Sequence, residues 1–156
     1  MGPIDRAYAA LAAALTGALV GSGLLESAEK FEIDPASPME PTGEADEVFR
    51  WAGLVRLPTT VQRQMLGSGA GRFVVEMDAR LELAVAGPEK AWRDQVWAAA
   101  LPALSNLPEA DPTLGGTAER FWISAFEPDD FPPNGAQALV TFTLRVRSGD
   151  RLGLSE

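Results

Sequence analysis

The chain has 156 residues, a length that fits one domain with one hydrophobic core. Hydrophobic residues make up 46% of it, as in ordinary globular domains, and the formal net charge of -9 argues against a protein that wraps duplex nucleic acid. Cysteine and histidine are both absent, which excludes disulfides, thiolate or imidazole metal sites, cysteine nucleophiles and histidine-based triads.

The first element is an uncharged stretch, Ala7–Leu25, that has the length of a signal peptide or a spanning segment. Asp5 neutralises Arg6 ahead of it, and Glu26 would occupy the -3 position of a cleavage site at Ala28, so both of those interpretations are disfavoured. One apolar stripe at spacings of three and four predicts instead a buried amphipathic helix, capped by Asp5; its members are Tyr8, Leu11, Leu15 and Leu19.

The next segment, 26–47, is acidic and proline-rich, with Lys30 as its one basic residue. Such a composition predicts an exposed, semi-extended linker, and the functional alternative is an acidic arm that lies on a partner. Short strands are predicted at Lys30–Ile33 and at Glu47–Trp51, before and after the prolines.

The clearest pattern is Arg72–Ala86, where apolar and charged residues alternate. Period two over this length predicts a long antiparallel strand with one buried face, and Val55–Leu66 is its expected partner. The glycine-rich stretch Gly67–Gly71 predicts the hairpin turn between them. A phosphate-binding loop is disfavoured, because no Gly-Lys-Ser/Thr comes after it and the segment leads into a strand.

A second helix is predicted from Pro88 to Leu107, with Pro88 in its first turn and an apolar, core-facing stripe that starts at Trp92. Pro102 is expected to kink or restart this helix near Leu101. Trp92 and Trp97 could stack on a ligand, but aromatic residues on a helix stripe more often belong to the core. The turn-rich stretch 109–116 connects the helix to the next predicted strand.

Two alternating strands, Ala118–Phe126 and Gln137–Arg147, complete the sheet. Phe121, Ile123 and Ala125 are expected on one face of the first. The polar, proline-rich stretch 127–135 predicts a loop between them. The fold class is therefore α+β, with two helices packed on one face of a mixed or antiparallel four- to five-stranded sheet. Residues 1–156 form a single domain in this prediction, with an irregular tail at 148–156.

Few side chains in the sequence suggest chemistry. Asp129 and Asp130 could hold a hard cation, but an isolated acidic pair is typical of a solvated turn. Ser105 has no histidine as base, and Lys30 and Lys90 are the only lysines. A glycosidase-type carboxylate pair stays open in principle, although the domain is small for a carbohydrate cleft. We predict no catalytic residues, no metal and no cofactor.

The order of elements resembles the tail terminator proteins of long-tailed, lambda-like bacteriophages and their counterparts in gene transfer agents. The segments that carry the resemblance span nearly the whole chain: Ile4–Leu11, Leu81–Val85, Trp92 with Pro102–Leu107, Asp111–Gly116 and Ala138–Arg147. The acidic linker and the tail depart from the compact members of that family.

The resemblance implies a non-enzymatic structural protein of the virion. Such a protein forms a hexameric ring on the head-proximal end of the tail tube, ends tube polymerisation there and joins the tail to the head or neck. Its expected partners are other copies of itself, the tail tube protein and a head or neck connector protein. It would assemble in the bacterial cytoplasm and stay at the tail-neck junction, with DNA passing through the ring, no sequence-specific nucleic-acid binding and no membrane.

Two kinds of assembly contact are expected. The hairpin tip and the second loop would reach axial neighbours, through Gly67, Ser68, Gly69, Asp129, Asp130 and Phe131. The outer strand face, with Arg80, Arg145 and Arg147 among Glu76, Asp78 and Glu82, would be exposed in the monomer and meet charged groups of adjacent subunits. The alternatives are another head-tail joining or tail completion protein, a small-ligand-binding α+β domain and a secreted domain.

Overall fold

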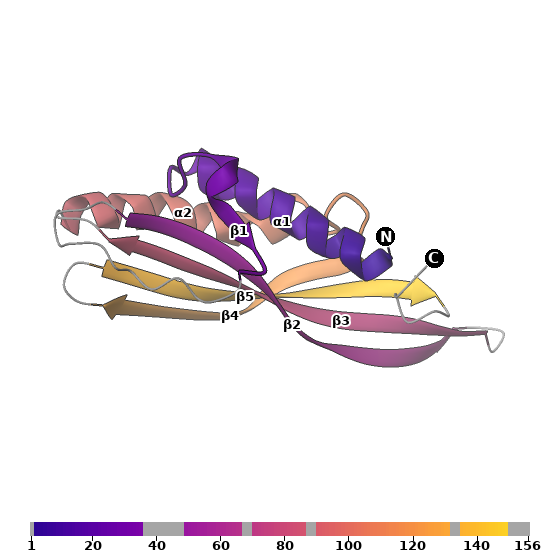
Figure 1. The fold of residues 1–156 in the computed structure, drawn as a ribbon. Coiled ribbons are helices and arrows are strands. Elements are labelled where there is room, and N and C mark those ends of the chain that lie inside the picture. Colours follow the sequence, from indigo (N-terminus) through magenta and orange to yellow (C-terminus); the bar gives the residue numbers. More distant parts are fainter. Residues whose placement is uncertain (1, 36–48, 67–69, 87–89, 132–134, 150–156) are drawn as a thin grey trace.

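A five-stranded sheet with two helices on one face makes up the fold (Figure 1). The computed structural model describes residues 2–35, 49–66, 70–86, 90–131 and 135–149. Its strand order is β1-β2-β3-β5-β4, with β1 parallel to β2 and the other pairs antiparallel. The elements are α1 (Pro3–Gly21), a 3-10 turn (Ala28–Lys30), β1 (Phe31–Ile33), β2 (Phe49–Leu66), β3 (Ala70–Ala86), α2 (Lys90–Ala110), β4 (Arg120–Phe131) and β5 (Gly135–Gly149). The predicted α+β class and the short strand ending at Ile33 are confirmed.

The central strand β3 has the predicted two-sided character. It pairs along its length with β2 on one side and β5 on the other. The side chains on its helix-facing side are fully buried, as at Met77 and Leu81, whereas Glu76 and Asp78 on the outer side keep partial exposure. The predicted hairpin with β2 is confirmed by the pairing of Leu66 with Ala70. Residues 67–69 between them lie outside the described part of the chain.

Strand β2 corrects the prediction of two separate strands at Glu47–Trp51 and Val55–Leu66. The structure has one strand from Phe49 to Leu66, with a shift in its register to β3 between Arg56 and Thr59. Pro58 falls inside that shift, at a position where its missing N–H removes no regular ladder hydrogen bond. Continuous pairing with β3 therefore holds together a segment that looks interrupted in the sequence.

Strand β4 corrects the prediction of a loop at 127–135. It continues to Phe131 and pairs residue by residue with β5, which begins at Gly135. Pro128 is tolerated because β4 is an edge strand, where a residue without an N–H can keep its other side to β5. Residues 132–134 lie outside the described ranges.

Helix α1 supplies much of the core. The predicted apolar stripe is buried, together with Ile4, Ala7 and Ala12 on the same face. The helix begins earlier than predicted, at Pro3, and Asp5 is not its cap: Gly2 occupies the N-cap position, and Pro3 fits the first turn because its missing N–H needs no partner. By length and composition α1 would suffice to cross a membrane, yet it packs on the sheet (Figure 1).

Helix α2 runs without interruption from Lys90 to Ala110, with Pro102 and Pro108 inside it, so the predicted restart near Leu101 is wrong. Proline removes one intrahelical hydrogen bond, but the buried side chains of Ala100 and Leu104 hold the helix on the core on both sides of Pro102.

A polar cluster ties α1 to the β1 edge of the sheet. The Tyr8 hydroxyl donates to Asp34 Oδ1 at 2.9 Å and also lies 3.1 Å from the Leu54 carbonyl oxygen. The Arg56 guanidinium stacks over the Tyr8 ring at 4.4 Å and pairs with Asp5 Oδ1 at 3.0 Å. Burial, together with the adjacent Asp34 carboxylate, raises the pKa of the Tyr8 hydroxyl far above its ordinary value of 10.0. The phenol is therefore held neutral as a hydrogen-bond donor.

This raised pKa predicts alkaline sensitivity. Above about pH 10 the unfolded chain releases the phenolic proton that the folded chain keeps, so stability from this group is complete below pH 10 and declines as pH rises toward the folded pKa. Tyr8→Phe should lower the free energy of unfolding by about 1 kcal/mol at neutral pH. It should also flatten the decline above pH 10, as measured by urea titration at several pH values.

Tyr8 is the single tyrosine, so tyrosinate absorbance reports on it alone. A phenol that ionises in the folded protein near pH 10 would contradict this account.

Candidate functional site

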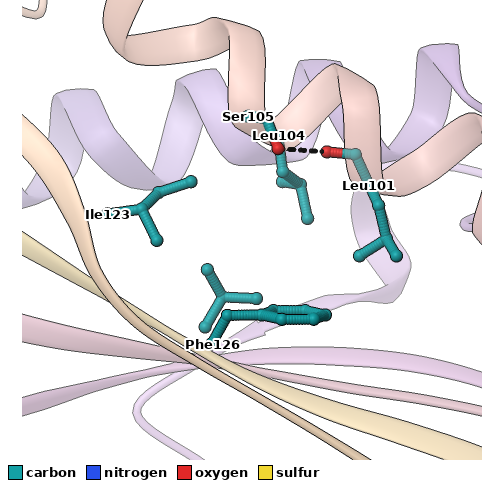
Figure 2. Close-up of a pocket in the computed structure, with 6 residues that line it drawn as sticks. Leu101, Leu104, Ser105, Ile123 and Phe126 are labelled. Atoms are coloured by element: carbon teal, nitrogen blue, oxygen red, sulfur yellow. Dashed lines mark hydrogen bonds between the residues drawn. The ribbon is translucent and has the colours of Figure 1, made fainter.

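An apolar groove opens between α2 and the edge strand β4 (Figure 2). Its volume is about 260 Å³, and its lining consists of Leu101, Leu104, Ser105, Ile123, Phe126 and Val140. The α2 residues lie on one side and the β4 residues on the other, with Phe126 at the floor in Figure 2. Phe126 is 46% exposed, which is unusual for a ring that faces the core side of a sheet.

A β-bulge explains why Phe126 lines this groove. Simple alternation predicts Phe121, Ile123 and Ala125 on one face, but the register of β4 to β5 shifts between Ile123 and Ala125. Beyond the shift Ala125 pairs with Thr141 on the outer face, and Phe126 pairs with Val140 on the helix-covered face. The predicted position of Ala125 is therefore wrong, because an extra residue in one strand reverses the faces of the residues beyond it.

The groove offers little for binding a polar ligand or for catalysis. Its one polar side chain is Ser105, and the Ser105 hydroxyl donates to the Leu101 carbonyl oxygen of its own helix at 2.9 Å. No cluster of three or more acidic side chains suited to a metal occurs among the described residues. A ligand site normally combines an apolar wall with several convergent polar groups, so this surface favours an apolar protein side chain as occupant.

The two sets of predicted loop contacts belong to two strand pairs, β2–β3 and β4–β5, that end at opposite ends of the sheet. Gly67, Ser68 and Gly69 lie outside the described residues, as do the side chains of Asp129, Asp130 and Phe131. The strands that lead into them are described, however. The pair Leu66 and Ala70 ends the β2–β3 hairpin, whereas Phe131 pairs with Gly135 at the other end of the sheet, beside Ala86. The two strand pairs therefore end at opposite ends of the sheet.

The predicted arginine contacts have partners within the chain. Arg145 and Arg147 both approach Glu119: Arg147 Nη2 lies 2.7 Å and Arg145 Nε 3.4 Å from its carboxylate oxygens. Arg80 Nη2 lies 3.0 Å from Glu82 Oε1. The Arg145 Nε atom is buried. Its contact with Glu119 is an ion pair without a hydrogen bond.

The outer strand face is therefore less open than the alternating sequence predicts. Glu82 is only 9% exposed and belongs to the buried residues, and Asp78 accepts a hydrogen bond from the Thr143 hydroxyl at 2.7 Å. All three predicted arginines are paired with carboxylates of this chain, and Arg147 is the most exposed of them, with 43% of its side chain accessible.

Sequence reasoning missed two exposed residues, Ile33 and Phe126. They are the large hydrophobic side chains that stay exposed in the described part of the chain, at 54% and 46%. Ile33 ends the short edge strand β1, and Phe126 lies on the edge strand β4. Alternation alone gave no signal for either, because their exposure results from edge positions that only the strand order reveals.

No protein-family model matches the chain, and no curated protein matches it. The solved structures similar to this chain include a chain from the structure described as "Virion of native gene transfer agent (GTA) particle". It is 12% identical, the TM-score is 0.40, and the match covers 90% of this chain and 97% of that chain. At a TM-score below 0.5, this likeness establishes no function.

Glu119 provides a test of the arginine contacts. The double variant Arg145→Glu/Arg147→Glu places three carboxylates together, so its free energy of unfolding should fall by about 1 kcal/mol. Adding Glu119→Arg restores opposite charges and should recover that loss in urea titrations. If the arginines also meet a neighbouring subunit, the triple variant remains impaired in assembly, as measured by native mass. Normal assembly of the triple variant would show that these arginines serve only intrachain pairing.

Proposed function

We propose that this chain is a non-enzymatic structural protein of a virion. In this proposal it forms a ring that caps the head-proximal end of a tail tube, ends polymerisation there and joins the tube to the head or neck. The family resemblance of the element order suggests this role and a copy number of six. The described surface supports a binding role over catalysis, because its groove is apolar and its one polar side chain is satisfied by the helix.

The observation that carries the proposal is the opposite direction of the two hairpins. The β2–β3 pair ends at Leu66 and Ala70, and the β4–β5 pair ends at Phe131 and Gly135, at opposite ends of the same strands. If the strands run roughly along the ring axis, one turn faces the tube and the other faces the neck. The sheet between them supplies a rigid spacer, as rigid scaffolds commonly do for contact loops.

Ring closure accounts for the end of polymerisation. A heterologous contact whose rotation closes gives a fixed copy number, and a ring with unlike axial faces binds the tube on one face only. The net charge of -9 favours passage of DNA through the opening without adhesion, because like charges repel. Another head-tail joining or completion protein would share this architecture, and the neighbour that it binds distinguishes it.

The test is electron microscopy of tubes grown from the cognate tube subunit with and without the protein. We expect density at one end of each tube, blocked growth at that end, and far less than one copy per tube subunit. Growth that proceeds unchanged, with bare tube ends, would contradict the terminator role. Binding to connector alone would indicate the joining alternative.

Variants of the two turns sharpen this test. Replacing Gly67, Ser68 and Gly69 by the two-residue turn Asn-Gly should impair contact with one axial partner. Replacing residues 132–134 in the same way should impair contact with the other. Each variant serves as the control for the other, and both should keep the wild-type melting temperature. Loss of the same partner in both would contradict opposite axial roles.

A further inference from the structure

The two exposed hydrophobic residues lie on the two edge strands of the described sheet. Ile33 lies on β1 at one edge, and Phe126 lies on β4 at the other. In the described ranges, neither strand has a partner on its outer side. A free strand edge with an exposed apolar side chain is a template for pairing with another chain.

Both residues lie at the same height along the strands. Ile33 pairs in register with Leu54, Leu54 with Leu81, Leu81 with Val140, and Val140 with Phe126. These five residues thus form one row that crosses the whole sheet. Because register partners point to the same side, Ile33 and Phe126 also belong to the same helix-covered face.

Strand direction allows this row to continue into a second copy. The strands β1, β2 and β5 run one way and β3 and β4 the other. A rotation about an axis along the strands leaves these directions unchanged, so β1 of one copy meets β4 of the next in antiparallel orientation. The two helix layers then lie on the same side, and Ile33 arrives beside Phe126.

The groove next to Phe126 can receive that side chain. Its volume of about 260 Å³ exceeds the roughly 150 Å³ of an apolar cavity that holds benzene. Leu101 and Ile123 offer an aliphatic wall on either side (Figure 2). Burying one isoleucine side chain in such a site is favourable because apolar surface leaves water.

We propose that the ring neighbour is a second copy of this chain that pairs its β1 with the free edge of β4, so that Ile33 packs against Phe126 and enters the groove. This inference rests on the proposed ring and names its subunit interface. The contact is heterologous, since the β1 edge of each copy meets the β4 edge of the next, and it therefore leaves one β1 edge and one β4 edge free until the ring closes.

Two carboxylates on the outer face of the sheet weaken the proposed contact between copies. Glu32 and Glu127 occupy the two ends of the adjacent register row, through Gly53, Glu82 and Leu139. In the joined sheet these two carboxylates face each other and repel. Assembly should therefore strengthen between about 50 mM and about 500 mM salt, because salt screens the repulsion.

Cysteine cross-linking tests the contact directly, because the natural chain has no cysteine. Ile33→Cys and Phe126→Cys are made as separate variants, and mixing them should give a disulfide between the two kinds of chain. Opposed residues of an antiparallel pair lie at about 4.5–5.5 Å between Cα atoms, within disulfide range. Ala13→Cys, exposed on α1, is the control and should cross-link to neither. Disulfides between two Phe126→Cys chains in place of the mixed species would overturn the proposal.

A variant that reverses one charge at this contact should strengthen assembly. Glu127→Lys faces Glu32 of the neighbour and should lower the concentration needed for half-assembly at least fivefold at low salt. Glu109→Lys makes the same charge change at an exposed position of α2 and should have less effect. Equal effects of the two lysines would contradict the edge contact.

The outcomes separate this inference from the proposed function. A ring of unchanged mass without the mixed disulfide overturns the interface and leaves the terminator role standing. A ring with the mixed disulfide that leaves tube growth unaffected supports the interface and rejects the terminator role. A chain that stays monomeric and forms no mixed disulfide overturns the interface.

Discussion

The fold depends on the burial of one face of β3. This strand lies in the middle of the sheet, and alternation along it divides the molecule into a helix-covered side and a charged side. The residues that point to the helices, such as Met77 and Leu81, are fully buried. A slip of one residue would move this entire set to the outer face, so the burial fixes the register with both β2 and β5.

One-sided coverage has a consequence at the edges. The two helices cover the apolar face of the sheet, but within the described ranges β1 and β4 each have one edge that pairs with no strand. The exposed residues Ile33 and Phe126 lie there, while ion pairs occupy the outer face. In the proposed ring, lateral contacts would use the edges and axial contacts the hairpin turns, so the two kinds of contact would be independent.

Period-two alternation in the sequence predicted the central strands of the sheet, but it did not predict the extension of β4 or the bulge within it. The long strand at Arg72–Ala86 and its hairpin with Val55–Leu66 were both evident from the pattern. The extension of β4 was not, because a proline and two aspartates at 128–130 have the composition of a loop, and only an edge position makes them compatible with a strand. The bulge after Ile123 was also hidden, since an extra residue leaves no mark in the composition.

The candidate site was the least predictable part. Phe126 acquires its place in the groove from the bulge, and Ile33 acquires its exposure from the strand order, so neither could be read from local sequence. The ion pairs of the three arginines were not predicted: Arg145 and Arg147 on β5 pair with Glu119, which lies ahead of β4, and Arg80 pairs with Glu82 two residues further along β3. Tyr8 was predicted as part of the core, whereas its hydrogen bonds to Asp34 and Leu54 depend on tertiary contacts.

The central claim is that copies of this chain close into a ring through two unlike edges. Native mass spectrometry of the full-length protein across a range of concentrations and salt tests it most directly. The account predicts one closed species of fixed copy number, with six copies expected from the family resemblance, and intermediates that disappear as salt rises. A monomer at every concentration, a dimer that grows no further, or an open series of masses without a limit would contradict it.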